Sequence, residues 1–194
     1  MKAVDNREKI LQCALELFYA RGYDAVGVQE IADKAGVTKP TMYYYFGSKY
    51  GLLEALVNEK LSNLNTAMRQ AADYHGNVPE TLYRMASQLI DLANENRKMY
   101  VLMMALYYSA KENEAYRAIR PLITELYGIV VRFFEDATPQ LGNIRGRQEQ
   151  FALGFLGILN QYILWMCEKT EEGCVVEEEK KHSLVNQFMY GIFT

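Results

Sequence analysis

The stretch VQEIADKAGVTKPTMYYYFGSK, from Val28 to Lys49, constrains the fold more than any other part of the chain. It holds two short segments with helical apolar spacing, separated by a turn in which Gly36 supplies conformational freedom. Thr38 is placed to cap the second segment, and Pro40 falls in its first turn, where a missing N–H leaves no helical bond unmade. The pattern predicts a helix-turn-helix, whose second helix can enter the major groove of DNA.

The rest of the chain has the pattern of further helices with short breaks. Asp5 and Glu8 are spaced to cap a first helix that ends at Gly22, and a second helix begins after Gly27. Ser48 caps a helix that we expect to continue to Tyr74. Later helices are expected over residues 79–96, 98–109, 114–136, 147–168 and 177–194, with a kink or break permitted at Pro121. The sequence therefore predicts an all-α fold.

A series of motifs at the N-terminus has a recognisable order and spacing: Leu17-Phe18, Gly22-Tyr23, Ile31-Ala32, Ala35-Gly36-Val37, Thr41-Met42-Tyr43, Tyr45-Phe46 and Ser48-Lys49. Over residues 7–56 the chain resembles the TetR family of bacterial transcriptional regulators. The resemblance implies a three-helix helix-turn-helix head at residues 1–50, on a helical body at residues 51–194 for ligand binding and dimerisation. Tyr50 and Gly51 replace acidic residues common in the family, which we expect to loosen the first turn of the fourth helix.

The predicted DNA-binding residues match family positions that touch DNA. They are Gln29, Thr38, Lys39, Pro40, Thr41, Tyr43, Tyr45 and Lys49. Lys49 would anchor a phosphate, and Lys39 and Gln29 would read base edges, since Lys can pair with guanine and Gln with adenine. We assign Met42 and Phe46 to the core. Tyr44 stays unassigned, because three successive tyrosines cannot share one helical face.

The distribution of charge fits a DNA-binding head only weakly. The chain carries a net charge of −3. Residues 1–50 hold seven Lys/Arg and six Asp/Glu, giving +1, and the remaining fourteen and eighteen give −4. We therefore expect the local placement of Lys39 and Lys49, rather than the total charge, to matter for DNA.

The body is rich in aromatic and methionine side chains, which could line an apolar pocket with a few polar tips. The candidate pocket residues are Tyr83, Met99, Tyr100, Met103, Tyr107, Tyr127, Tyr162 and Trp165. The family resemblance implies an effector site in this region. Ordinary core packing remains the alternative for each residue taken singly. We expect a mainly apolar or aromatic effector that releases a repressor from its operator.

The two C-terminal helices are expected to form a homodimer. The run 151–167 is apolar nearly all round, and Leu184, Phe188 and Ile192 repeat every four residues. The candidate interface residues are Phe151, Phe155, Leu159, Leu184, Phe188 and Ile192. As in the family, two heads on a twofold axis would suit a palindromic operator in double-stranded DNA. A monomer core is the alternative.

Other classes of protein are less well supported. His75 and His182 have no neighbouring ligand cluster in sequence, and no nucleophile elbow or phosphate loop occurs, so we expect no metal, no cofactor and no enzyme activity. The three cysteines lack a C-x-x-C motif, which favours reduced thiols in a cytoplasm, with a redox role for Cys167 and Cys174 left open. We expect the run 151–167 to be a buried helix rather than a membrane span. The alternative function is a helical interaction protein without sequence-specific DNA binding.

Overall fold

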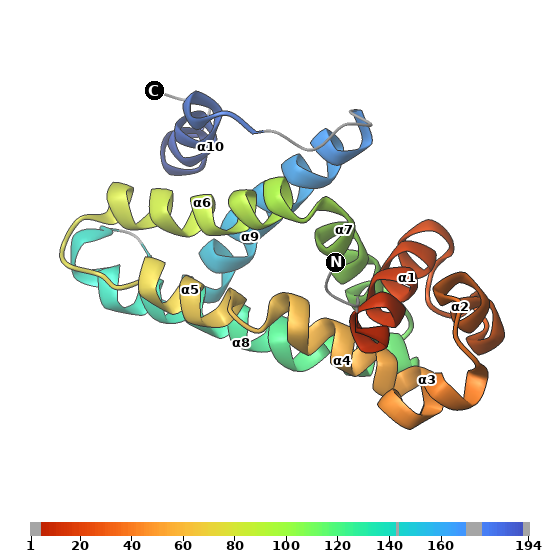
Figure 1. The fold of residues 1–194 in the computed structure, drawn as a ribbon. Helices are drawn as coiled ribbons and strands as arrows, with labels where there is room; N and C mark the ends of the chain where they lie inside the picture. The colour runs from red at the N-terminus through yellow and green to blue at the C-terminus, as the bar shows by residue number, and fades with distance from the viewer. Residues whose placement is uncertain (1–4, 143, 170–175, 192–194) are drawn as a thin grey trace. The chain divides into compact units, whose positions relative to one another are not determined.

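A computed structural model describes residues 5–142, 144–169 and 176–191, and every regular element in these ranges is helical (Figure 1). This confirms the all-α prediction. The helices are α1 Asn6–Arg21, α2 Val28–Ala35, α3 Lys39–Phe46, α4 Lys49–Leu61, α5 Leu64–Ala71, α6 Val78–Glu95, α7 Arg97–Tyr107, α8 Glu114–Ala137, the short 3₁₀ helix η1 Thr138–Gln140, α9 Gln148–Lys169 and α10 Glu178–Tyr190.

The helices divide into two compact units, which differ from the expected domains. The head unit comprises Met1–Ser62 and Lys98–Pro121, and the body unit comprises Asn63–Arg97 and Leu122–Thr194. A boundary after residue 50 would cut α4 behind its second residue. The head unit therefore contains nearly all of α7 and the first two turns of α8, besides the first four helices.

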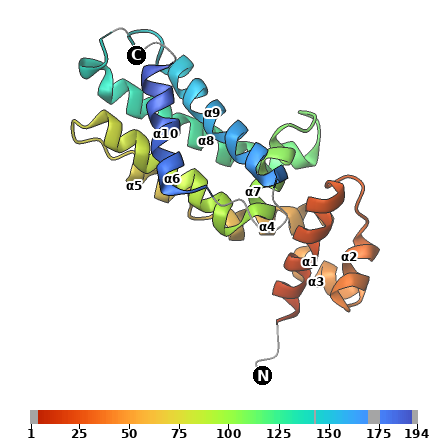
Figure 2. The same cartoon turned by 90° about the horizontal axis from the view of Figure 1, so that it is seen from above.

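The first four helices surround a small apolar core. Asp5 caps α1 by accepting a hydrogen bond from the backbone N–H of Arg7 at 3.1 Å, and α1 ends at Gly22 with φ 79°. Its inner face includes Ile10 and Phe18, which are almost fully buried. On the outside, Lys60 of α4 reaches Glu8 at 3.0 Å. These contacts hold α1 against α4, with α2 and α3 packed on the pair (Figure 2).

The prediction that the fourth helix continues to Tyr74 is wrong. Helix α4 ends at Leu61, and a separate helix α5 begins at Leu64. Just after the break, Asn65 is buried and donates from its amide to the carbonyl oxygen of Leu122 at 3.2 Å and to Glu125 at 2.7 Å, which ties the start of α5 to α8. The sequence carries no glycine or proline at this break, so helical spacing alone did not reveal it.

The body unit packs α6 against α5, α9 and α10. Lys181 of α10 is buried, with its ammonium 2.6 Å from Asp91 of α6 and 2.6 Å from Glu178. The pairing with two carboxylates makes the burial of this charge tolerable. Pro121 lies inside α8, which continues through it from Glu114 to Ala137 rather than breaking there.

Helix α9 is covered along one stripe only. Its buried residues are Ala152, Phe155, Leu159, Ile163 and Cys167. On its other sides Leu153 is 62% exposed and Trp165 is 52% exposed. The expectation of a buried helix therefore holds for one face. By length and composition α9 could cross a membrane, but core helices of soluble proteins pass the same test.

Two of the three cysteines and both histidines fall within the described residues. Cys13 and Cys167 are free thiols, and Cys174 lies outside the described residues. Desolvation by partial burial raises the pKa of Cys13. His75 is exposed between α5 and α6, 3.0 Å from Asp73, and His182 stacks on Tyr83 with the ring centres 4.0 Å apart. The described residues bring together no group of three potential metal ligands.

Candidate DNA-binding site

The turn between α2 and α3 has the geometry that its sequence predicts. Gly36 ends α2 in the left-handed region, at φ 64° and ψ 35°. This conformation costs glycine little, because glycine lacks a Cβ atom. The hydroxyl of Thr38 then accepts a hydrogen bond from the backbone N–H of Thr41 at 3.3 Å, and Pro40 occupies the first turn of α3. The two helices are thus joined by a short, capped turn.

Helix α3 presents one face to the core and the opposite face to solvent. Met42 is fully buried, as predicted, whereas Phe46 is only half-buried. Tyr43 is 40% exposed and Tyr44 is 84% exposed. The remaining predicted residues divide between exposed positions, Gln29, Thr38, Lys39 and Pro40, and half-buried ones, Thr41, Tyr45 and Lys49. The exposed face of α3 is therefore polar and aromatic, which suits contact with phosphates and base edges.

Tyr44 was not among the predicted DNA-binding residues, yet it is the most exposed aromatic side chain of α3. Helical spacing in the sequence was enough to predict the exposure of Tyr44. Two residues span about 200° on a helix, so a buried Met42 places Tyr44 on nearly the opposite face. The edge of its ring lies against Tyr45, with the centroids 5.3 Å apart.

The exposed polar residues already form local contacts that orient them. The amide of Gln29 donates to Asp33 at 2.7 Å, and the hydroxyls of Thr38 and Thr41 lie 2.8 Å apart. The ammonium of Lys39 lies over the ring of Tyr43, 5.9 Å from its centre. Each group keeps further hydrogen-bonding capacity, since a Lys ammonium carries three donors and a Gln amide carries two.

Lys49 is more enclosed than expected for a simple phosphate anchor. Its ammonium lies 4.2 Å from the ring centre of Tyr23 and 3.5 Å from the carbonyl oxygen of Asp24. Partial burial lowers the pKa of Lys49, while the charges of Asp24 and Glu114 act in the opposite direction. Lys49 therefore braces the α1–α2 loop in the free protein, besides standing at the start of α4.

The same loop is tied to the start of α8 within the head unit. The hydroxyl of Tyr23 donates to Glu114 at 2.6 Å, and the amide of Asn113 donates to Asp24 at 2.5 Å. Burial and the bond to Glu114 raise the pKa of Tyr23, so its hydroxyl stays protonated and remains a donor at neutral pH. Helices far apart in sequence therefore fix the loop behind the helix-turn-helix.

The turn into α4 depends on Gly51. Ser48 caps α4 by accepting a hydrogen bond from the backbone N–H of Gly51 at 2.9 Å. A Cβ atom at Gly51 would overlap the carbonyl oxygen of Phe46, the last residue of α3. The expectation that Gly51 loosens this turn is thus wrong, because the missing side chain lets the two helices approach closely.

The predicted pocket residues do not form one cluster within either unit. Met99, Tyr100 and Met103 are buried in the head unit, where Tyr107 lies beside Tyr116 with the ring centres 5.9 Å apart. The other four, Tyr83, Tyr127, Tyr162 and Trp165, belong to the body unit. The division arises because α7, which carries the first group, packs as part of the head unit.

The body residues of that set have different surroundings. Tyr83 donates to Glu178 of α10, and Tyr127 donates to the carbonyl oxygen of Glu149 at 3.3 Å. Tyr162 and Trp165 line a shallow hollow of about 520 Å³ on the surface of α9 and α10. None of these contacts by itself marks an effector site.

Three of the predicted interface residues are used inside the protomer. Phe155, Leu159 and Leu184 are buried where α9, α10 and α6 pack together, so they cannot meet a partner subunit without unpacking the chain. Phe151 and Phe188 are half-buried and face each other, with ring centres 6.3 Å apart. Ile192 lies outside the described residues. The four-residue repeat of α10 therefore marks mainly an intrachain surface.

Comparison with known proteins finds a match in the part of the chain that holds the helix-turn-helix. The sequence model for bacterial regulatory proteins of the tetR family covers residues 10–56. The HTH-type transcriptional activator FasR of Mycolicibacterium smegmatis is 45% identical over 67 residues, which are 34% of this chain and 31% of FasR. This chain thus aligns with less than a third of FasR.

Two other similarities extend over the whole chain. IcaR of Staphylococcus aureus, the negative transcriptional regulator of the biofilm operon icaADBC, is 24% identical over 189 residues, covering 94% of this chain and 98% of IcaR. The crystal structure of the transcriptional regulator FadR from Bacillus subtilis with stearoyl-CoA has a TM-score of 0.76 at 19% identity, covering 95% and 98% of the two chains. The family match spans the helix-turn-helix and its supporting helices, so residues 10–56 form the N-terminal region of bacterial regulatory proteins of the tetR family.

Proposed function

We propose that this protein is a sequence-specific DNA-binding transcriptional regulator that inserts α3 into the major groove. The observation that carries the proposal is the exposed face of α3, with Lys39, Tyr43 and Tyr44 projecting from a helix held by the buried Met42. Side chains on such a face reach base edges and phosphates, whereas the supporting helices stay outside the groove. The regulator would act on cytoplasmic DNA, and no catalytic role is proposed.

The test of this function is selection of duplex DNA from a random pool by the purified protein. A sequence-specific regulator should enrich a defined, palindromic site and bind it much more tightly than unrelated duplexes at the same salt concentration. Enrichment of no sequence would favour the alternative, a helical interaction protein that has kept the fold without sequence-specific DNA binding.

If the ammonium of Lys39 reads a base edge, Lys39→Ala is expected to weaken the free energy of binding to the selected duplex by about 1–3 kcal/mol. It should also relax the sequence preference at one base pair. Lys111→Ala is a matched control, since it removes the same charge from an exposed loop of the head unit. Titration of selected and random duplexes measures both effects. Equal losses of affinity on the two duplexes would assign Lys39 to the phosphate backbone.

The body is proposed to bind a small apolar or aromatic effector that releases the protein from its operator. The structural neighbour FadR was solved with stearoyl-CoA, which supports a ligand-binding body in this fold. An effector can change DNA affinity only through different affinities for two arrangements of the protein, and operator DNA must change effector affinity by the same factor.

We also propose a homodimer formed by the outer face of α9 together with α10. Leu153 and Trp165 are exposed on α9, and Trp165 lines the hollow of about 520 Å³ together with Ile158 and Tyr162 of α9 and Leu184 of α10. Exposed apolar surface of this kind is typical of protein–protein interfaces. These residues replace the buried Phe155, Leu159 and Leu184 as the proposed contacts.

The double variant Leu153→Glu, Trp165→Glu is expected to be a folded monomer that binds a palindromic site far more weakly, because two half-sites are no longer engaged together. Tyr108→Glu is a matched control, since Tyr108 is 73% exposed but belongs to the head unit. Sedimentation at micromolar concentration measures the assembly. A double variant that sediments as a dimer would rule out this interface.

A further inference from the structure

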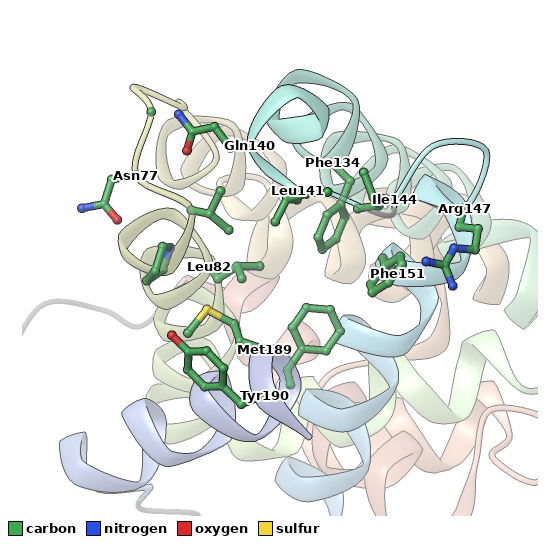
Figure 3. Close-up of a pocket in the computed structure, with 15 residues that line it drawn as sticks. Asn77, Leu82, Phe134, Gln140, Leu141, Ile144, Arg147, Phe151, Met189 and Tyr190 are labelled. Carbon is green, nitrogen blue, oxygen red and sulfur yellow. The ribbon is translucent and has the colours of Figure 1, made fainter. Parts of the chain in front are cut away.

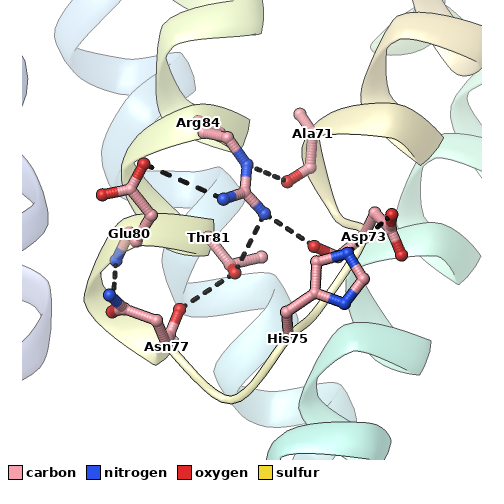
Figure 4. A network of polar contacts seen from close by, with 7 residues as sticks. All are labelled: Ala71, Asp73, His75, Asn77, Glu80, Thr81 and Arg84. Atoms are coloured by element: carbon pink, nitrogen blue, oxygen red, sulfur yellow. Dashed lines mark hydrogen bonds and ion pairs between the residues drawn. The ribbon is translucent and has the colours of Figure 1, made fainter.

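The turn between α5 and α6, in the body unit, is fixed by the guanidinium of Arg84 (Figure 4). Arg84 donates to the carbonyl oxygens of Ala71 at 3.2 Å and Asp73 at 2.6 Å, and to the hydroxyl of Thr81 at 3.2 Å. A planar group with fixed donors must break all of these bonds together in order to leave. Arg84 is therefore a permanent structural brace.

The same turn forms part of the wall of a cavity of about 650 Å³ in the body unit (Figure 3). The wall includes Asn77 from the turn and the apolar side chains of Leu82, Phe134 and Phe188. None of the eight predicted pocket residues lines this cavity. The bonds of Arg84 thus shape the body unit, whereas a basic side chain in the head unit is held differently.

The α1–α2 loop of the head unit is braced by Lys49, whose ammonium is held much more loosely. It lies 4.2 Å from the ring centre of Tyr23 and 3.5 Å from the carbonyl oxygen of Asp24. The second distance is longer than that of a typical hydrogen bond, and attraction to a ring face does not depend on the direction of one donor. The ammonium of Lys49 can therefore leave its place at a lower cost in free energy than the guanidinium of Arg84 can.

Two carboxylates attract the ammonium of Lys49 to this place. Glu114 accepts a hydrogen bond from the hydroxyl of Tyr23 at 2.6 Å, and Asp24 accepts one from the amide of Asn113 at 2.5 Å. Both donors are neutral groups, so neither bond cancels the charge of its carboxylate. The charges of Asp24 and Glu114 oppose the lowering of the pKa of Lys49 by burial, so both carboxylates act on its ammonium.

Lys49 also follows the recognition helix closely in the chain. Helix α3 ends at Phe46, and Lys49 is the first residue of α4, whose first turn contains no acidic residue. With α3 in the major groove, we expect this position to bring the ammonium near the phosphate backbone, which lysine side chains contact in protein–DNA complexes. A phosphate would then compete with the two carboxylates for the ammonium of Lys49.

We propose that Asp24 and Glu114 restrain DNA binding by holding the ammonium of Lys49 in its place in the free protein, and that this ammonium moves to a DNA phosphate in the complex. The proposal rests on the DNA-binding function above and adds a restraining contact to it. The binding free energy gained at the phosphate is reduced by the free energy of the contacts that Lys49 gives up. The two carboxylates therefore lower DNA affinity, although neither lies on α2 or α3.

The test is titration of the selected duplex with two variants that each remove one charge and keep one hydrogen bond. The amide oxygen in Glu114→Gln can still accept from Tyr23, and the amide oxygen in Asp24→Asn can still accept from Asn113. We expect each variant to bind the duplex about two- to fivefold more tightly than the parent, as the loss of an exposed ion pair allows. Glu112→Gln is the matched control, since it removes the same charge from an exposed position two residues before Glu114, and it should change DNA affinity less.

The Lys49→Gln background shows whether the gain in DNA affinity passes through Lys49. Because the ammonium is absent there, Glu114→Gln should increase DNA affinity no more than Glu112→Gln does. Melting temperatures near that of the parent would show that the variants are folded. A larger gain that persists in the Lys49→Gln background would overturn the restraint. So would a gain in the parent that is no larger than that of Glu112→Gln.

Proton NMR of the full chain reports the place of Lys49 directly. Protons that lie over an aromatic ring are shifted upfield, so the ε-methylene protons of Lys49 should show this shift in the free protein, in a signal that Lys49→Gln removes. We expect the shift to disappear when the selected duplex is added. A Lys49 signal that lacks the shift in the free protein, or keeps it on the duplex, would overturn the proposal. A parent chain that selects no duplex would instead refute the DNA-binding function itself.

Discussion

Gly51→Ala is expected to destabilise the head unit and abolish high-affinity DNA binding. The added methyl group would overlap the carbonyl oxygen of Phe46, which is backbone and cannot turn aside as a side chain can. The turn between α3 and α4 must open instead, which should lower the free energy of unfolding by roughly 1–3 kcal/mol. Because α3 ends at this turn, opening it moves the recognition helix away from the position that Met42 fixes.

The control is Gly128→Ala in the middle of α8, where an added methyl group meets no described atom within 4 Å. There the higher helix propensity of alanine should stabilise the protein by about 0.5–1 kcal/mol. Thermal unfolding and duplex titration give the two readouts. A Gly51→Ala variant with the melting temperature and DNA affinity of the parent would show that α3 and α4 need no close approach.

The head was predictable from sequence because its determinants are local. Gly36, Thr38 and Pro40 each specify a backbone conformation within a few residues of themselves, and the structure has the turn, the cap and the helix start that they predict. Met42 is likewise buried, as helical spacing required. Local signals of this kind do not depend on how distant parts of the chain pack.

The errors in the prediction concern contacts that helical spacing does not show. Asn65, just after the end of α4, is bonded to α8, and the need for glycine at position 51 depends on the carbonyl group of Phe46. Lys49 turns onto Tyr23 because the α1–α2 loop passes beside it. Each of these contacts joins residues that no periodicity relates, so the sequence pattern held no signal for it.

The candidate effector and dimer sites were harder to predict for the same reason. A sequence rich in aromatic and methionine residues predicts a buried helix, but it does not predict in which of the two units that helix is buried. Tyr100 is completely buried in the head unit, whereas the cavity in the body unit uses Phe134 and Phe188. Apolar spacing on α10 similarly predicted a buried face for Leu184 without distinguishing an intrachain partner from another subunit.

Helix α7 belongs to the head unit, so a change in its buried face is expected to affect DNA binding. Leu102 of α7 is 1% exposed and, with Gly22, Tyr23 and Ala25 of the α1–α2 loop, lines a hollow of about 250 Å³. Lys98, at the start of α7, reaches Glu16 of α1 at 3.9 Å. Leu102→Ala would enlarge the hollow and remove support from the loop that Tyr23 anchors. We expect it to destabilise the protein by about 2–5 kcal/mol and to weaken DNA binding, although residue 102 lies far from α3 in sequence.

Leu89→Ala separates this effect from a general loss of stability. Leu89 is equally buried and loses the same atoms, but it belongs to α6 of the body unit. Both variants should melt at lower temperature. Amide hydrogen exchange in residues 10–35 should accelerate in Leu102→Ala and stay near the parental rate in Leu89→Ala, because local opening follows the contacts that support each segment. Equal exchange in the two variants would mean that α7 does not support the head, and that the first four helices hold the recognition helix without it.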